Sequence, residues 1–103
     1  MKYLTFIALF LTLNLSAQEF SLLEINAKWN AKNSLPQKEL AGLDIKFAWL
    51  ENQPQVIQKS VKAVPMLILM KDGRPVHQWQ GGINLKLAIT DEDIKKVISK
   101  IKM

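Results

Sequence analysis

The chain has 103 residues and no cysteine, which excludes thiol–disulfide exchange by the protein itself as well as every structural disulfide. Its formal net charge is +5, from 14 lysine and arginine residues against 9 acidic residues. Arg74 is the only arginine and the lysines are spread along the chain, so the pattern indicates solvated faces and not the basic stripe of a nucleic-acid interface.

The N-terminal region has the layout of a secretory signal peptide. Residues 1–3 form a short, positively charged start, residues 4–15 are mostly apolar, and residues 16–17 are a small-residue exit. The apolar run is shorter than the roughly 20 residues that a permanent membrane anchor needs. We therefore expect a signal peptide at residues 1–17 and one exported domain at residues 18–103, periplasmic or secreted, with no stable membrane insertion after cleavage.

Two strands and a helix are predicted in the first half of the domain. Residues 20–26 are apolar on both alternating faces, which is typical of a central strand covered on both sides. Residues 31–43 carry leucines on one helical face and end near Gly42, a residue suited to a helix C-terminus. Pro36 lies either in the first turn of this helix or at a kink. Residues 45–50 are predicted to form the second strand.

The second half is predicted to contain a short helix followed by a hairpin. Pro54 favours a helix start, and the helix is expected to end near Ser60. Residues 66–70 are wholly apolar and form the third predicted strand. An Asp-Gly pair, typical of a tight hairpin turn, follows this strand. Residues 76–80 are therefore predicted to pair antiparallel with the third strand.

The last predicted element is an amphipathic helix that Thr90 caps. Three acidic residues fill its first turn, where the helix dipole favours negative charge, and isoleucine and valine recur at i, i+3, i+4 and i+7. The complete order is β-α-β-α-β-β-α. This order predicts an α/β fold with a four-stranded mixed sheet and helices on both faces.

This order of elements resembles the thioredoxin family, and the first matching segment spans residues 22–33. The segment is similar to the family's strand, acidic residue, tryptophan and Cys-Gly-Pro-Cys run. Glu24 lies in the place of the acid, and Trp29 lies in the place of the tryptophan. Asn30 and Asn33 stand where the family has its two cysteines.

Two further segments support the resemblance. Residues 63–69 are similar to the family segment that holds a cis-proline opposite the active site, here Pro65. Residues 71–73, followed by Gly81, resemble the family's hairpin turn and later glycine. The resemblance implies a minimal thioredoxin-like fold over nearly all of residues 18–103, without the family's additional N-terminal strand and helix.

The resemblance implies the fold without the family's activity, because a neutral amide offers neither a nucleophile nor a proton-transfer group. We therefore expect the protein not to be an enzyme and to need no cofactor. Asparagine is a favoured N-cap residue, so Asn30 is interpreted as a helix cap and Asn33 as an ordinary first-turn or surface residue. A disulfide oxidoreductase, which the fold alone suggests, is the disfavoured alternative.

Two other titratable residues are candidates for a functional site. Glu24 matches the buried acid of the family, and the alternative is a partly exposed or lysine-paired carboxylate; burial would raise its pKa. His77 is the only histidine. One imidazole without cysteine or a carboxylate cluster does not make a metal site, so no metal is expected.

The resemblance also implies a cis bond between Val64 and Pro65. In relatives the residue before this proline offers its backbone to an extended peptide, a strand addition that needs no cysteine. The alternative is that the bond only shapes the turn into the third strand. Trp29 is either a contact anchor, as tryptophan often is in interfaces, or a cover for the end of the sheet.

These expectations combine into a functional hypothesis of an exported, redox-inactive, non-catalytic module that binds an extended peptide or a partner protein. The alternative is a small structural subunit or antagonist of an envelope complex that docks through an outer sheet edge or the lysine-rich helix. The oligomeric state stays open. The expected binding groove consists of Trp29, Asn30, Asn33, Val64, Pro65 and Gly81.

Overall fold

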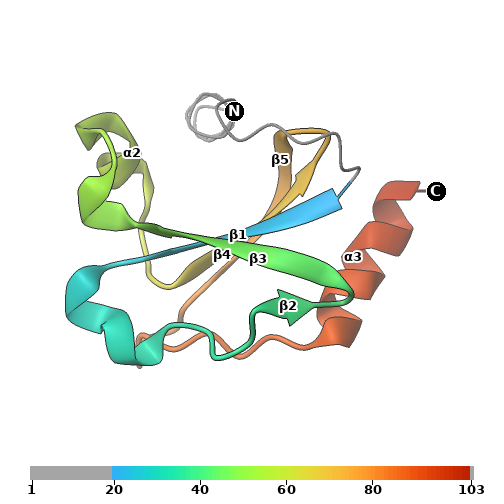
Figure 1. Cartoon of the computed structure of the whole chain (residues 1–103), viewed down its shortest axis with the longest axis horizontal. Coiled ribbons are helices and arrows are strands. Elements are labelled where there is room, and N and C mark those ends of the chain that lie inside the picture. Colours follow the sequence, from blue (N-terminus) through green and yellow to red (C-terminus); the bar gives the residue numbers. More distant parts are fainter. Residues whose placement is uncertain (1–19, 103) are drawn as a thin grey trace.

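A five-stranded mixed sheet organises residues 20–102, the part of the chain that this computed structural model describes (Figure 1). The signal peptide predicted at residues 1–17 lies outside the described residues. In sheet order the strands are β2 (Glu39–Leu40), β3 (Leu43–Trp49), β1 (Phe20–Asn26), β4 (Met66–Lys71) and β5 (Arg74–Gln80). β1 is parallel to β3 and antiparallel to β4, and the pairs β2–β3 and β4–β5 are antiparallel.

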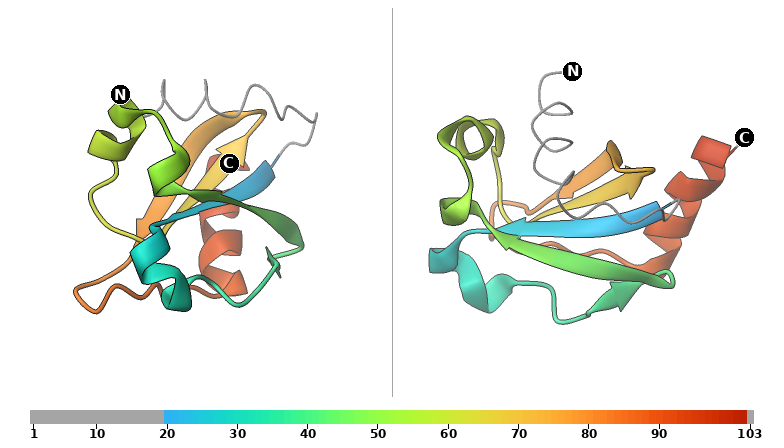
Figure 2. Two further views of the ribbon diagram at one scale, coloured as in Figure 1. Left: turned by 60° about the vertical axis from the view of Figure 1, so that its left-hand side comes forward. Right: turned by 45° about the horizontal axis from the view of Figure 1, so that its top comes forward.

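Within residues 20–102, four helical segments connect or flank the strands. The longest is α3 (Asp91–Lys102), and α2 (Gln55–Ser60) is a short α-helix; η2 (Lys28–Asn33) and η3 (Leu50–Asn52) are 3₁₀ segments. α2 and α3 lie at opposite ends of the sheet (Figure 2). Among the described residues, no helix combines the length and apolar character that crossing a membrane requires.

The central strands bury apolar side chains on both faces, as the sequence of β1 predicts. On one face Leu22 of β1 and Leu67 of β4 pack with Ile94 of α3. On the other face Leu23 and Ile25 of β1 form a second cluster with the alternate side chains of β4. Burial of a large aliphatic side chain contributes roughly 1.5–3 kcal/mol, so these two clusters are the main source of stability.

The predicted helix at residues 31–43 is wrong. The structure has η2, an extended stretch, the two-residue strand β2, and a turn at Ala41 and Gly42, whose φ angles are 53° and 78°. The leucines that suggested one helical face reach the same core without a helix, with Leu40 buried and Leu35 packed against its cluster. The extra strand makes the sheet five-stranded, where the sequence predicted four strands.

The other predicted elements are present. β1 has the predicted bounds, and β4 and β5 are each slightly longer than expected. Asp72 and Gly73 both have positive φ, 53° and 80°, as the two central residues of a tight hairpin turn require. At the start of α3 the Asp93 N–H donates to Thr90 Oγ1 at 3.3 Å, and the Thr90 N–H donates to Asp93 Oδ2 at 2.9 Å. This reciprocal pair confirms the predicted cap.

Candidate functional site

The residues that the sequence singled out meet at the end of the sheet where β1, β3 and β5 finish and β4 begins (Figures 1 and 2). Two hydrogen bonds join the segments there. The Gly81 N–H donates to the Pro65 carbonyl at 2.8 Å, and Asn30 Nδ2 donates to the Leu85 carbonyl at 3.1 Å. The loop after β5 therefore links η2 to the turn that precedes β4. We call this end the loop end.

Asn30 lies inside the protein, with 2% of its surface exposed. Its Nδ2 donates to the Leu85 carbonyl and to Asn26 Oδ1, each at 3.1 Å. Its Oδ1 accepts a hydrogen bond from Asn33 Nδ2 at 2.7 Å. Both sides of the amide are thus occupied by the protein, so Asn30 positions η2 against the Leu85 loop.

Asn26, the last residue of β1, completes this amide cluster. Its Nδ2 donates to the Asn30 carbonyl at 3.0 Å and to Ser34 Oγ at 2.8 Å. Its Oδ1 also accepts the Ala27 N–H at 2.9 Å. Asn26 is fully buried, and buried amides are tolerated where their donors and acceptors are paired, as they are here. Asn26 was not among the residues predicted for the site, although a polar residue at the end of a buried apolar strand indicates such a position.

The interpretation of Asn30 as an N-cap is wrong. Ala27 holds the cap position of η2, and no side-chain cap bond forms there. Instead, the Lys28 N–H donates to both carboxylate oxygens of Glu51, at 2.9 and 3.0 Å. Glu51 belongs to η3, 23 positions further along the chain, so no local sequence pattern could have revealed this contact.

Glu24 is a buried carboxylate in the middle of β1, with 2% of its surface exposed. Its Oε2 accepts the Leu35 N–H at 3.0 Å. Burial raises the pKa of Glu24 above its ordinary value of 4.5, and the hydrogen bond from Leu35 offsets part of that increase. Of the two sequence interpretations, the structure therefore supports the buried acid. In this chain the acid holds the extended stretch after η2 against the sheet.

The peptide bond between Val64 and Pro65 is cis, as the resemblance implied. Val64 and Pro65 are both buried. No hydrogen bond joins the Val64 N–H to any described residue. A β-carbon added to Gly81 would overlap the Val64 carbonyl oxygen and lie 2.9 Å from its carbonyl carbon, so glycine is required for this close approach.

Two large apolar side chains at the loop end are exposed to solvent. Trp29 on η2 has 66% of its surface exposed, and Ile83 on the loop after β5 is fully exposed. Most of the Trp29 side chain is therefore open to solvent. Ile83 was not among the residues predicted for the groove. The signal was an apolar residue directly after a Gly-Gly pair.

His77 lies apart from these residues, as an exposed residue on the edge strand β5. Its ring packs edge-on against Trp79, with centroids 4.6 Å apart. Among the described residues, no three histidine, cysteine or acidic side chains come together as a possible metal site.

No family model matches the chain, and no curated protein matches it in sequence. Solved structures match its fold. A thioredoxin of Fasciola hepatica superposes with a TM-score of 0.54 at 18% identity, over 87% of this chain and 86% of that one. A thioredoxin of Malassezia sympodialis gives a TM-score of 0.48 at 14% identity, over 84% and 77% of the two chains. A designed protein also gives 0.48, at 10% identity, over 99% and 90%.

The first of these matches covers most of both chains and supports a thioredoxin-like fold for this one. Asn30 and Asn33 follow Trp29 on η2, and both side chains are neutral amides. The protein is therefore thioredoxin-like in fold, and it carries no cysteine.

Proposed function

We propose that the protein is a redox-inactive, non-catalytic binding module, exported to the periplasm or beyond, that holds an extended peptide or a partner protein at the loop end. The observation that carries the proposal is the Val64 N–H, which has no hydrogen-bond partner among the described residues. This backbone donor is free to give a hydrogen bond to the carbonyl of a bound peptide. Extended peptides add to folded proteins through such backbone bonds.

Two exposed apolar side chains also support binding at the loop end. Trp29 and Ile83 stand out from the loop end, where a partner side chain can pack against them. Tryptophan is enriched among the residues that dominate binding energy in interfaces. Compared with the groove expected from the sequence, the proposed contacts are Trp29, Ile83, the Val64 backbone and the surface at Gly81. Asn30 and Asn33 act indirectly by holding the segments that carry these contacts.

A non-catalytic role is supported by the chemistry of the amide cluster. Asn26, Asn30 and Asn33 are neutral, and their polar atoms bond to one another and to neighbouring groups. Glu24 has no thiol to accept a proton from, since the chain has no cysteine. In an insulin-reduction assay with dithiothreitol we expect the same rate with and without the protein. Any acceleration would contradict the redox-inactive part of the proposal.

The binding role is tested with a library of extended peptides and the purified protein, by following tryptophan fluorescence and then isothermal titration. We expect Trp29→Ala to weaken the selected peptides at least tenfold, in line with a hot-spot contribution of more than about 1.4 kcal/mol. The matched control is Val76→Ala, which truncates an exposed apolar residue on β5. Peptides that bind both variants equally well would contradict binding at the loop end and would favour docking through an edge of the sheet or through α3.

Export is tested separately, by mass spectrometry of the protein recovered from the periplasmic fraction. The expected N-terminus is Gln18. A chain that retains residues 1–17 in the cytoplasmic fraction would contradict export without affecting the binding proposal.

A further inference from the structure

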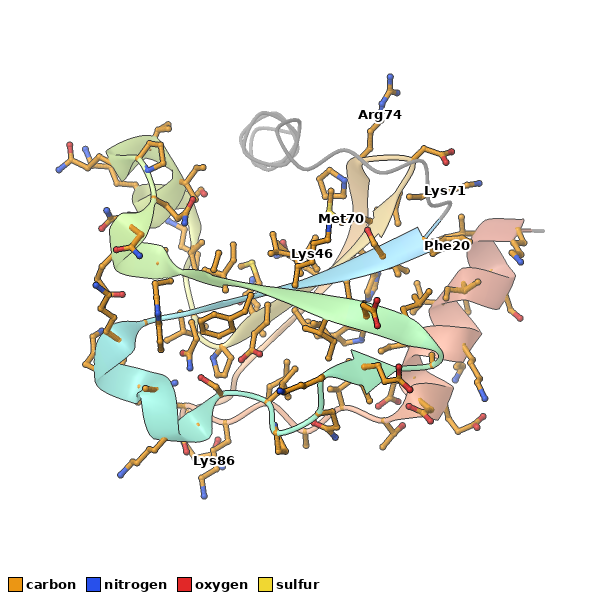
Figure 3. All side chains as sticks on the ribbon, in the orientation of Figure 1. Phe20, Lys46, Met70, Lys71, Arg74 and Lys86 are labelled. Atoms are coloured by element: carbon orange, nitrogen blue, oxygen red, sulfur yellow. The ribbon has the colours of Figure 1, made fainter. Side chains whose placement is uncertain are left out.

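The charge at the loop end indicates the chemistry of the partner, and this inference rests on the binding role proposed above. Lys28 and Lys32 lie on η2 on either side of Trp29, and both are exposed. Lys86 is exposed on the loop after β5, directly after the Leu85 carbonyl that Asn30 holds. Figure 3 shows the Lys86 side chain extending away from the protein below η2.

These cations have no carboxylate partner in the described part of the chain. No ion pair joins Lys28, Lys32 or Lys86 to an acidic side chain there. Glu51 is the exposed acid at this end, and both of its oxygens accept the Lys28 backbone N–H. Glu24 is buried inside the protein, so it is not an exposed acid of this surface.

The remaining described acids belong to elements at the other end of the sheet. β2 and the start of β3 carry Glu39 and Asp44, and the hairpin turn carries Asp72. The first turn of α3 carries three more acids, and one of them, Asp91, accepts the Ala41 N–H at 2.9 Å. The loop end therefore carries a net positive charge, to which Lys59 in α2 and Lys62 after it also contribute.

We propose that the partner segment is an acidic, extended peptide with one large apolar side chain. The apolar side chain packs against Trp29 and Ile83, and flanking aspartate or glutamate residues lie opposite Lys28, Lys32 and Lys86. Complementary charge of this kind accelerates encounter and selects between partners, and it weakens as salt screens it.

A peptide fits these observations better than the other polyanions. Arg74, the sole arginine, lies in the hairpin at the opposite end of the sheet. A site for nucleic acid stacks several bases on aromatic rings, whereas Trp29 is the one large aromatic ring exposed on η2 and the loop after β5. An anionic membrane would suit the lysines and Trp29, but phospholipids present no extended backbone that can pair with the Val64 backbone as an added strand does. The membrane is therefore an outcome of the test and not the proposal.

The test uses three synthetic peptides of equal length, each with a central leucine in a threonine- and valine-rich frame. Their flanks carry glutamate, glutamine or lysine, and binding to the purified protein is measured by isothermal titration at low and high salt. We expect the glutamate peptide to bind about tenfold more tightly than the glutamine peptide at low salt, as expected for a few exposed ion pairs. The advantage should shrink several-fold in about 0.5 M salt.

Two triple variants of equal charge separate local from general attraction. Lys28→Gln/Lys32→Gln/Lys86→Gln removes the proposed cations, and Lys95→Gln/Lys96→Gln/Lys100→Gln removes the same charge from α3. The first variant should abolish the preference for the glutamate peptide, and the second should retain it. Circular dichroism confirms that both variants remain folded.

Each other outcome overturns a defined part of the argument. Equal binding of the glutamate and glutamine peptides, or equal loss in both triple variants, contradicts the acidic partner and leaves the binding role standing. Binding only to vesicles of an anionic phospholipid contradicts both the acidic peptide and the peptide-binding role. Failure to bind any of the peptides and the vesicles contradicts the binding module as a whole.

Discussion

Residues 28–43 and residues 66–102 keep their shapes by different kinds of interaction. In residues 66–102, β4, β5 and α3 are built from regular backbone pairing and from apolar side chains buried against β1. In residues 28–43 the chain follows an irregular path that individual polar side chains fix: the amide cluster, Glu24 on Leu35 and Glu51 on Lys28. Packing is shared among many contacts, whereas each of these polar bonds holds one point of the chain. Substitutions in the two regions should therefore differ in how much stability they remove and in how much of the chain they affect.

The largest effect is expected in the packed region, from Leu67→Ala. Leu67 has no exposed surface and lies in the cluster between β1 and α3. Truncation leaves a cavity and should lower the free energy of unfolding by about 2–5 kcal/mol, measured by urea unfolding. Val76→Ala on the neighbouring strand removes a half-exposed side chain and should change it by less than about 0.5 kcal/mol. Similar losses in both variants would contradict the importance of the buried cluster.

The next effect tests the contact between the loop after β5 and the turn before β4. Gly81→Ala places a methyl group against the Val64 carbonyl and 3.0 Å from Pro65 Cδ. The backbone must move apart, so we expect a loss of about 1–3 kcal/mol and weaker peptide binding. Gly82→Ala is the matched control, since its methyl group would meet only Asn84 Oδ1, at 3.6 Å. A Gly81→Ala protein with unchanged stability and binding would show that this approach is not required.

A somewhat smaller and more local effect is expected from Asn30→Ala. The change leaves the Leu85 carbonyl and Asn33 Nδ2 without their partner, which should cost about 1–2 kcal/mol. Hydrogen exchange should accelerate around Leu85 and η2 while β4 and α3 stay protected. Uniform acceleration over the whole sheet would contradict the idea that the amide cluster acts locally.

The smallest effect concerns the dependence of stability on pH. Burial raises the pKa of Glu24, so above the ordinary value of 4.5 the folded protein binds more protons at this group than the unfolded chain. The contribution of Glu24 to stability is therefore greatest at low pH and falls as pH rises through the raised pKa. Glu24→Gln should flatten this decline, measured by urea unfolding at several values from about pH 4 to about pH 8. Parallel curves for the two proteins would contradict the assignment.

The packed region is also the region that the sequence predicted well. The apolar run of β4, the Asp-Gly turn and the stripe on α3 are local patterns, and the structure contains all three. Residues 31–43 were misread because Leu35 and Leu40 fit a helical spacing, yet they reach the core along an extended path. The positive φ angles of Ala41 and Gly42 and the bond from Glu24 to Leu35 decide that path.

Part of the backbone at the candidate site was predicted. The cis bond at Pro65 was implied by the resemblance and is present. Gly81 was expected in the groove, but its close approach to Val64 was not predicted. The interior position of Asn30 depends on Asn26 and on a carbonyl 55 positions away, and the partner of Lys28 is 23 positions away. Pairings at such distances have no local pattern, so they could not be read from one sequence.

The amide cluster gives the loop end a further property. Asparagine side chains neither titrate in the physiological range nor change oxidation state, and here they set the position of the Leu85 loop. The surface formed by that loop and η2 should therefore keep one shape in oxidising and reducing surroundings alike. A partner that binds there would be governed by its own abundance and by salt, and not by the redox poise of the compartment.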